Sequence, residues 1–525
     1  MNPAIFHITH FNNLHSIIQL NGLCCNKIDI TYFNPKHNKN LISLKKYSEN
    51  VPLFEGLHIF KSNTIVIEKL KDQKKLLANG ELVHSYPHSW RSKAPLVHRA
   101  TPQWFISMDS HQLRNKALKA IDETKFYPSK GKERLKAMIE TRPDWCVSRQ
   151  RVWGVPLPIF INKKTKEILI DDEVNENIAK IYEKEGSDCW FSDDPQRFLG
   201  TKYKAEDYEK MSDIVEVWFD SGSTHSFVLE KREDLKWPAS MYLEGSDQHR
   251  GWFHSSLLES CGTRGRAPFE TILSHGFVVD GRGFKMSKSL GNVIAPEEIL
   301  KRYGADILRI WVASSNYAED LKIDYSILEQ HADSYRKIRN TFRYLLGNVN
   351  DNYEELKLSS IDINRLPELE QFILHRVFMI NENFKKYFYN YDFHNLYKEL
   401  LNFCVVDLSA FYFDVRKDCL YCDPKNSKKR SSVILVLNII LKMLLRWFAP
   451  ILSFTTEEIF SLLLKKKSIH LEKFIDVPKE FRNDRLNMKW LDLLKIRNIC
   501  NLSIEEKRKE KIIGSSLEAS ILLKL

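Results

Sequence analysis

Two regions with different hydrophobic patterns follow one another along the chain. Between about residues 51 and 320, short apolar runs alternate with amphipathic stretches and turns, which predicts alternating strands and helices. Between about 320 and 480 the short apolar runs stop, and long amphipathic stretches predict helices only. The pattern therefore indicates an α/β layer followed by an all-α region.

Local signals place several elements in the α/β region. Apolar runs at 214–218, 242–243 and 277–279 are strand candidates. Ser246 is a candidate cap for a helix that follows the second run. Pro296, followed by two glutamates, is expected to begin another helix. Proline fits the first helical turn, and acidic side chains are favourable at a helix N-terminus.

The stretch from Val433 to Phe454 is apolar enough to be mistaken for a membrane span. Asn438, Lys442 and Arg446 recur every four residues within it, so they share one stripe of a helix. We interpret the stretch as an amphipathic helix whose wide apolar face is buried against other helices, and we expect no membrane association.

Composition and charge agree with a globular protein. Of 525 residues, 43% are hydrophobic and 28% are charged, and the length suggests about three or four domains. The net charge of +11 suits a polyanion such as RNA, and equally a solvated basic surface. Nine cysteines show no disulfide pattern, and the CxxC of Cys419 and Cys422 lacks a second pair. We therefore expect a reducing, cytoplasmic location and no structural zinc.

The pentapeptide Lys285-Met286-Ser287-Lys288-Ser289 carries the most specific chemical signal. It follows an apolar run and a glycine-containing turn and precedes a predicted helix, so both lysines are expected on a loop. Phosphoryl and adenylyl transfer need such positive charges beside a triphosphate, because negative charge builds on its bridging and leaving oxygens. A solvated basic loop is the alternative for any two lysines at this spacing, but the whole pentapeptide in this context favours function.

A second candidate site begins at Glu244. This residue is expected at the carboxyl end of a strand, where open α/β sheets bind ligands, and Gly245 lets a ligand approach the backbone. The carboxylate could hold an ammonium group or ribose hydroxyls, and the N-terminus of the next helix favours anions. The alternative is a capped helix beside an exposed glutamate.

Two further stretches combine aromatic and polar residues. Residues 145–156 interleave tryptophans with arginines, which suits contact with nucleotides or nucleic acid, but equally suits buried tryptophans beside surface arginines. The pattern at residues 214–222 predicts an apolar strand that ends in a polar turn, an arrangement typical of strands that line a binding site.

Together these four stretches resemble one family. From about Val51 onward the chain resembles the C-terminal half of isoleucyl-tRNA synthetases, which are class I aminoacyl-tRNA synthetases. Five more stretches carry the resemblance, at 84–91, 101–105, 303–306, 334–341 and 407–414. The family implies an incomplete Rossmann-like α/β catalytic half followed by an all-α anticodon-binding domain. It also implies activation of isoleucine with ATP and Mg²⁺, then transfer to isoleucine tRNA.

The resemblance also implies roles for individual residues. Those implied in ATP binding are Lys285, Met286, Ser287, Lys288 and Ser289, of which Lys285 and Lys288 are catalytic. Those implied in aminoacyl-adenylate binding are Glu244, Gly245, Asp247, Gln248 and His249. In the helical region Arg336, Arg339 and Arg343 share one helix face. We expect them to contact tRNA phosphates, although a solvated face is the default for any such helix.

The resemblance divides the chain into five segments. These are a foreign N-terminal segment and linker at 1–50, the C-terminal border of the editing region at 51–140, the second half of the catalytic domain at 141–320, the anticodon-binding domain at 321–480 and a truncated C-terminal segment at 481–525.

The beginning of the chain departs from the family. It has no His-x-Gly-His signature, although His7 to His10 is a lookalike, and most of the editing domain is absent. Residues 3–25 instead weakly resemble the opening of DarT-type ADP-ribosyltransferases, whose catalytic acid has no room before Val51. We therefore expect little activation of isoleucine by this chain alone, and a separately encoded N-terminal half would be its partner. The alternative is a catalytically inactive remnant that binds tRNA.

Overall fold

The structure, a computed structural model, describes residues 103–523 except 152, 288–289, 350–352, 354–355 and 465–466, and shorter stretches between 42 and 96. The chain forms two compact units, one of residues 1–114 and 142–221 and the other of residues 115–141 and 222–525. The His7 to His10 lookalike, the DarT-like stretch, Lys288 and Ser289 lie outside the described residues.

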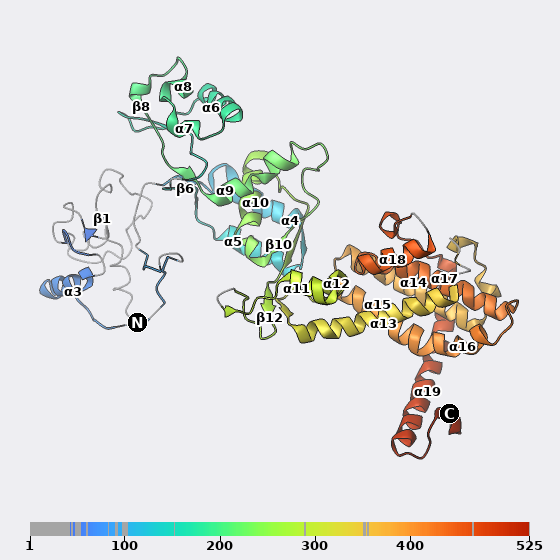
Figure 1. The fold of residues 1–525 in the computed structure, drawn as a ribbon. Coiled ribbons are helices and arrows are strands. Elements are labelled where there is room, and N and C mark those ends of the chain that lie inside the picture. The colour runs from blue at the N-terminus through green and yellow to red at the C-terminus, as the bar shows by residue number, and fades with distance from the viewer. Residues whose placement is uncertain are drawn as a thin grey trace. The chain divides into compact units, whose positions relative to one another are not determined.

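The first unit contains short antiparallel strand pairs and small helices (Figure 1). The pairs are β1 (Ile42–Ser43) with β2 (Lys46–Tyr47), β3 (Phe105–Ile106) with β5 (Trp145–Cys146), β6 (Ser148–Arg149) with β9 (Ile214–Val215), and β7 (Phe160–Asn162) with β8 (Tyr208–Lys210). The helices are α3 (Ser62–Asp72), α6 (Asp172–Glu185), α7 (Cys189–Ser192), α8 (Pro195–Leu199) and α9 (Val217–Gly222), the last of which ends at the unit boundary. Phe160, Trp190 and Phe198 pack together in one of its cores.

The predicted strand at 214–218 is wrong beyond its second residue. β9 ends at Val215, and the chain turns into α9. The cause lies at Glu216, whose buried carboxylate accepts hydrogen bonds from the Trp145 indole and the Arg149 guanidinium. Its carbonyl accepts from the amide of Phe219, which begins a helical turn. Because the buried Glu216 carboxylate needs these hydrogen-bond partners, its position fixes where the strand ends.

The second unit is built on a parallel three-stranded sheet in the order β10 (Tyr242–Gly245), β11 (Thr271–His275), β4 (Lys125–Tyr127). Glu244 pairs with Ser274, and Leu273 pairs with Tyr127. The accompanying helices are α4 (Leu113–Glu123), α5 (Lys130–Glu140) and α10 (Trp252–Arg264). The strand predicted at 242–243 is confirmed.

The next elements lead from the sheet to the helical region. β12 (Val278–Asp280) pairs in parallel with β13 (Leu321–Ile323), and between them lie α11 (Pro296–Tyr303) and α12 (Ala305–Ser314). The strand predicted at 277–279 is confirmed with a shift of one residue. The helix predicted at Pro296 is confirmed, with Glu297 and Glu298 in its first turn.

Ser246 does not cap a helix, contrary to the prediction. It begins a 3₁₀ turn, Ser246–His249, and α10 begins only at Trp252. The side chain of Gln248 explains the difference, because its Oε1 accepts a hydrogen bond of 2.9 Å from the amide of Trp252. Gln248 thus satisfies an N-terminal donor of α10 that would otherwise lack a partner.

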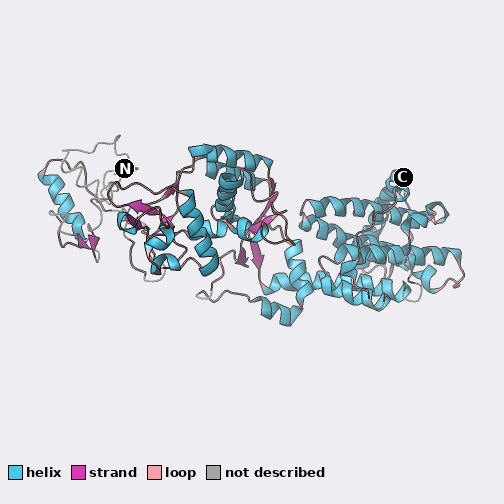
Figure 2. Cartoon of the chain, turned by 90° about the horizontal axis from the view of Figure 1, so that it is seen from above, coloured by secondary structure: helices cyan, strands magenta, loops and turns pink. Residues whose placement is uncertain are grey.

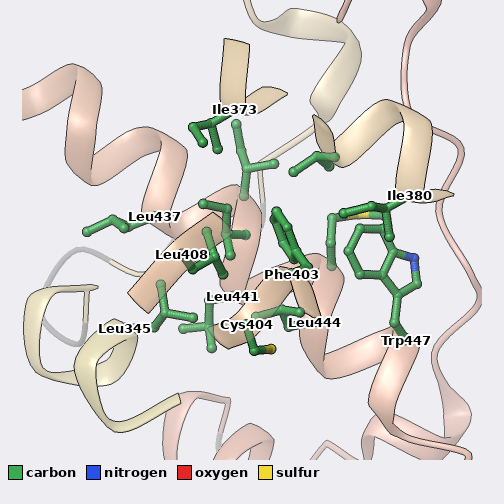
Figure 3. Close-up of a cluster of buried hydrophobic side chains, with 14 of the residues drawn as sticks. Leu345, Ile373, Ile380, Phe403, Cys404, Leu408, Leu437, Leu441, Leu444 and Trp447 are labelled. Atoms are coloured by element: carbon green, nitrogen blue, oxygen red, sulfur yellow. The ribbon is translucent and has the colours of Figure 1, made fainter. Parts of the chain in front are cut away.

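Beyond β13 the described residues form helices and loops without strands (Figure 2). The helices are α13 (Tyr325–Val349), α14 (Glu368–Tyr389), α15 (Phe393–Asn402), a π-helical segment (Phe403–Tyr412), α16 (Phe413–Tyr421), α17 (Lys428–Phe448), α18 (Ser453–Leu463) and α19 (Asp484–Lys509). Figure 3 shows part of their shared core, in which Phe403 and Trp447 lie among leucines and isoleucines of several helices. The predicted all-α region is confirmed.

Helix α17 is long and apolar enough to cross a membrane, but 78% of its most apolar window is buried inside the protein. The predicted polar stripe is buried as well, since Asn438, Lys442 and Arg446 are all less than 10% exposed. Lys442 Nζ donates to the carbonyl of Leu356 at 2.6 Å, and Arg446 donates to Glu472 at 2.6 Å. The helix is therefore buried on its polar side too, and these bonds offset the loss of hydration.

The start of α19 is expected to loosen as the pH falls. The Asn483 amide donates to Nδ1 of the buried His375 at 2.9 Å, so this nitrogen is unprotonated, and Asn483 in turn caps α19. Burial lowers the pKa of His375. Its folded pKa is thus below the unfolded value of about 6.5. The resulting stability is present above that pH and is lost as the pH falls through the folded pKa.

Amide exchange of residues 483–487 at pH 7.5 and pH 5.5, corrected for the intrinsic pH dependence of exchange, measures this effect. We expect weaker protection at pH 5.5. His375→Gln is the control, because its side-chain oxygen can accept the same bond without titrating, and it should remove the pH dependence. Protection that is equal at both pH values in the parent protein would contradict the prediction.

Candidate functional site

The segment from Glu244 to His249 lies at the carboxyl end of β10, as predicted. Glu244 and Asp247 are exposed, and the amide of Gly245 donates to Glu244 Oε2 at 3.2 Å. A Cβ on Gly245 would lie 2.7 Å from Asp247 Oδ1, so a side chain there would displace that carboxylate. The sheet thus ends in two solvent-facing carboxylates, whereas Gly245 between them is buried.

His249 belongs to the same segment but is closed to solvent. It is 1% exposed, and its Nδ1 donates to the carbonyl of Ser246 at 2.8 Å. Burial lowers its pKa, which favours the neutral ring. Its Nε2 lies 2.9 Å from the position that a Cβ on Gly131 of α5 would occupy. In this structure His249 packs the 3₁₀ turn against α5, while Glu244 and Asp247 stay open to ligands.

The described part of the pentapeptide lies between β12 and α11. Lys285 is exposed, and Met286 packs against the core that contains Ile299, Trp311 and Leu321. The methionine therefore anchors the loop while the lysine stays in solvent. Lys288 lies outside the described residues, and its role stays a prediction.

Two residues that we did not select from the sequence hold this loop. Asn292 Oδ1 accepts from the amide of Ser287 at 2.9 Å, and its Nδ2 donates to Asp280 Oδ2 at 3.0 Å and to the carbonyl of Lys285 at 3.3 Å. The hydrogen bond from Asn292 and those from backbone amides lower the pKa of Asp280. An Asp followed by Gly at the end of a strand was the available signal for Asp280, because Asp commonly bonds the backbone of a following turn.

The three arginines proposed for tRNA contact lie along one side of α13. Arg336, Arg339 and Arg343 are exposed, whereas Ile338 and Phe342 on the same helix are buried. The predicted amphipathic pattern is confirmed, and contact with RNA stays a prediction. Arg336 also pairs with Asp333 one turn earlier.

The two aromatic stretches lie in the first unit up to residue 221, and residue 152 is outside the described residues. Trp145 is buried and Arg149 pairs with Glu216, which matches the structural alternative for this part of 145–156. Trp153 differs, because it is 91% exposed. Trp218 lies half-exposed on α9 and not in the predicted strand.

Among the residues that the structure describes, no three His, Cys, Asp or Glu side chains are grouped so as to hold a metal ion. Cys419 is buried and Cys422 is exposed, and both are free thiols.

Two sequence families match the chain. The family described as tRNA synthetases class I (I, L, M and V) matches residues 12–324, and the anticodon-binding domain of tRNA ligase matches residues 370–523. The chain therefore belongs to the class I tRNA synthetases of the isoleucine, leucine, methionine and valine group. The first match begins inside the segment that we assigned to a foreign origin. The expected order, a catalytic α/β part followed by a helical anticodon-binding domain, is confirmed.

Curated relatives carry the name isoleucine–tRNA ligase. The protein from Pelagibacter ubique is 79% identical over 481 residues, which are 91% of this chain and 53% of that protein. The one from Brucella abortus is 50% identical over 467 residues, or 87% of this chain and 47% of that protein. The chain thus spans about half the length of the curated relatives that it matches.

Solved structures of related enzymes show a limited likeness. A methionyl-tRNA synthetase of Mycobacterium tuberculosis in complex with methionyl-adenylate has a TM-score of 0.49 and 16% identity, and the match covers 73% of this chain and 66% of that one. A leucyl enzyme from Agrobacterium radiobacter, in a ternary complex with tRNA, has a TM-score of 0.47 and 19% identity, and the match covers 66% and 43%.

Proposed function

We propose that this chain contributes the second half of the catalytic domain and the anticodon-binding domain of a cytoplasmic isoleucine–tRNA ligase. The observation that carries the proposal is the 79% identity to the Pelagibacter ubique relative, which extends over 91% of the chain. That identity makes an inactive tRNA-binding remnant the less favoured alternative. The complete activity belongs to the whole length of such an enzyme, whether one polypeptide or a separate N-terminal half supplies the rest.

The side chains of Glu244, Asp247 and Lys285 are exposed, and they suit the binding of the amino acid and of ATP in aminoacyl-adenylate formation. Glu244 offers a carboxylate to the substrate ammonium or to ribose hydroxyls, with Asp247 beside it. Lys285 and Lys288 offer positive charge to the triphosphate, where charge develops as pyrophosphate leaves. Mg²⁺ would accompany the nucleotide, because this ion commonly takes ligands from substrate phosphates and water and few from protein.

A chimeric enzyme tests the proposal. Residues 51–525 of this chain would replace the corresponding part of the Pelagibacter ubique relative, and pyrophosphate exchange would be measured with isoleucine, valine, leucine and methionine in turn. We expect exchange that depends on isoleucine, and little exchange by this chain alone. A folded chimera that prefers another amino acid, or that activates none, would overturn the proposal.

The arginines of α13 are proposed to contact tRNA phosphates. Replacing Arg336, Arg339 and Arg343 together by alanine should weaken tRNA binding and flatten its salt dependence. Each lost phosphate contact removes about 0.7–0.9 from the slope of log K against log salt. Filter binding at several salt concentrations, with isoleucine tRNA and an unrelated tRNA, measures both quantities.

The matched control removes the same charge from exposed lysines of the first unit, Lys166, Lys180 and Lys184. If this control weakens binding as much as the arginine variant, the effect is one of net charge and the stripe has no special role. Failure of the parent chain to bind either tRNA at low salt would reject the contact.

A further inference from the structure

The loop between β12 and α11 is closed by one amide side chain. Asn292 lies seven residues after Lys285, yet it bonds to the backbone of Lys285 and Ser287 and to the carboxylate of Asp280. Asp280 is buried at the end of β12, and its other oxygen accepts from the amides of Arg282 and Phe284 at 3.0 and 2.9 Å. One carboxylate therefore joins the turn before the pentapeptide to Asn292, the third residue after it.

The orientation of the Asn292 amide follows from its neighbours. Its oxygen faces a backbone N–H, and its nitrogen faces a carboxylate oxygen and a carbonyl, both of which can only accept. The flipped amide would place its oxygen against two acceptors and its nitrogen against a donor, so all three bonds would be lost. Aspartate at this position would put two carboxylates in contact, and leucine would leave Asp280 and the carbonyl of Lys285 without a donor and the amide of Ser287 without an acceptor.

We propose that Asn292, held by Asp280, is the positioning residue that fixes the backbone of Lys285 to Ser287 and thereby orients Lys285 toward the triphosphate. The first part stands on the hydrogen bonds alone, and the second rests on the proposed function. Met286 fixes the same segment by packing, so the loop has one apolar and one polar anchor. Asn292 would act through the backbone of the loop, to which its side chain bonds.

Amide exchange on the whole chain tests the first part. Because Ser287 N–H donates to Asn292, Asn292→Leu should speed exchange of the Ser287 amide about ten- to a hundredfold, the range for losing a hydrogen bond within a charged network. The amides of Arg282 and Phe284 serve as internal controls, since Asp280 still holds them in this variant. Unchanged Ser287 exchange would overturn the proposal.

Exchanging the two side chains tests whether the specific pair of Asn292 and Asp280 protects the Ser287 amide, or whether any change that disorders the loop exposes it. Asn292→Asp and Asp280→Asn should each release Ser287, because each leaves two like groups facing one another. The double variant restores a donor opposite a carboxylate but not the bond to the carbonyl of Lys285, so exchange should be slower than in either single variant without returning fully to the parent value. A double variant that exchanges as fast as the single ones would show that the pairing does not matter, and would overturn the proposal.

The chimera described above tests the second part. Asn292→Leu should lower kcat for isoleucine-dependent exchange about tenfold, in line with the loss of one positioned contact, and leave the KM for isoleucine unchanged, with partial recovery in the swapped pair. If the parent chimera is inactive but the amide-exchange results are as expected, the proposed function is wrong, while the role of Asn292 in positioning the loop is supported. If the parent chimera is active and Asn292→Leu matches it, the link to the triphosphate fails.

Discussion

Replacing Glu370 by alanine should lower the free energy of unfolding of the helical region by about 3–5 kcal/mol. Glu370 is fully buried in α14, and the guanidinium of Arg416 donates to both of its oxygens at 2.7 Å. Tyr412 donates to the same carboxylate at 3.2 Å. Without Glu370, the buried Arg416 would keep its charge and lose its counterion, which is among the most costly single changes in a protein core.

Urea unfolding followed by circular dichroism measures this loss. Glu382→Ala on the same helix is the matched control, because Glu382 is exposed and its pair with Lys385 should contribute less than about 1 kcal/mol. A double variant, Glu370→Leu with Arg416→Met, should cost much less than Glu370→Ala, since it leaves no buried charge. If Glu370→Ala unfolds at the same urea concentration as the control, the pair does not stabilise the helical region.

Replacing Lys288 by alanine in the chimera should slow adenylate formation about 10²–10³-fold, the usual cost of removing one positioned group that stabilises transition-state charge. The ammonium group is expected beside the triphosphate, where charge builds as the bond to pyrophosphate breaks. Single-turnover formation of isoleucyl-adenylate at saturating ATP isolates this step from binding and product release. The KM for isoleucine should change little.

Lys301→Ala is the matched control for Lys288, because Lys301 is an exposed lysine of α11, thirteen residues further along the chain. Its adenylate formation should stay within about twofold of the parent, as is usual for surface substitutions. Glu244→Ala should act differently and weaken binding of a stable adenylate analogue by about ten- to a hundredfold, through a lost charge-assisted hydrogen bond. If Lys288→Ala and Lys301→Ala give equal rates, the assignment of Lys288 is wrong.

Local patterns in the sequence were sufficient to predict many of the helices and strands. The apolar run before Glu244 predicted β10, Pro296 marked the start of α11, and the spacing in α13 predicted its buried and exposed faces. These features depend on neighbouring residues and on the period of one element. The pentapeptide at 285–289 was recognisable for the same reason, because its chemistry is contained in five consecutive residues.

Contacts between distant residues account for what the sequence did not reveal. The end of β9 depends on Glu216 meeting Trp145 and Arg149 some seventy positions earlier. The polar stripe of α17 is buried because carbonyls of distant loops accept from Lys442 and Arg446. Asn292 appeared only as a residue after the pentapeptide until its bonds to Asp280 and Ser287 were seen. No periodicity encodes such pairings, since they depend on tertiary packing.

The pairing of β4 with β11 has a consequence for the synthesis of the chain. Lys125 pairs with Thr271, so the two strands lie 146 residues apart in sequence. At a translation rate of about 5–20 residues per second, β4 is synthesised roughly 7–30 s before its partner strand. For most of that time α5 also lacks its contact with His249, which packs against it in the folded protein. A nascent chain that stalls between these points would present an unpaired strand to any chaperone at the exit tunnel.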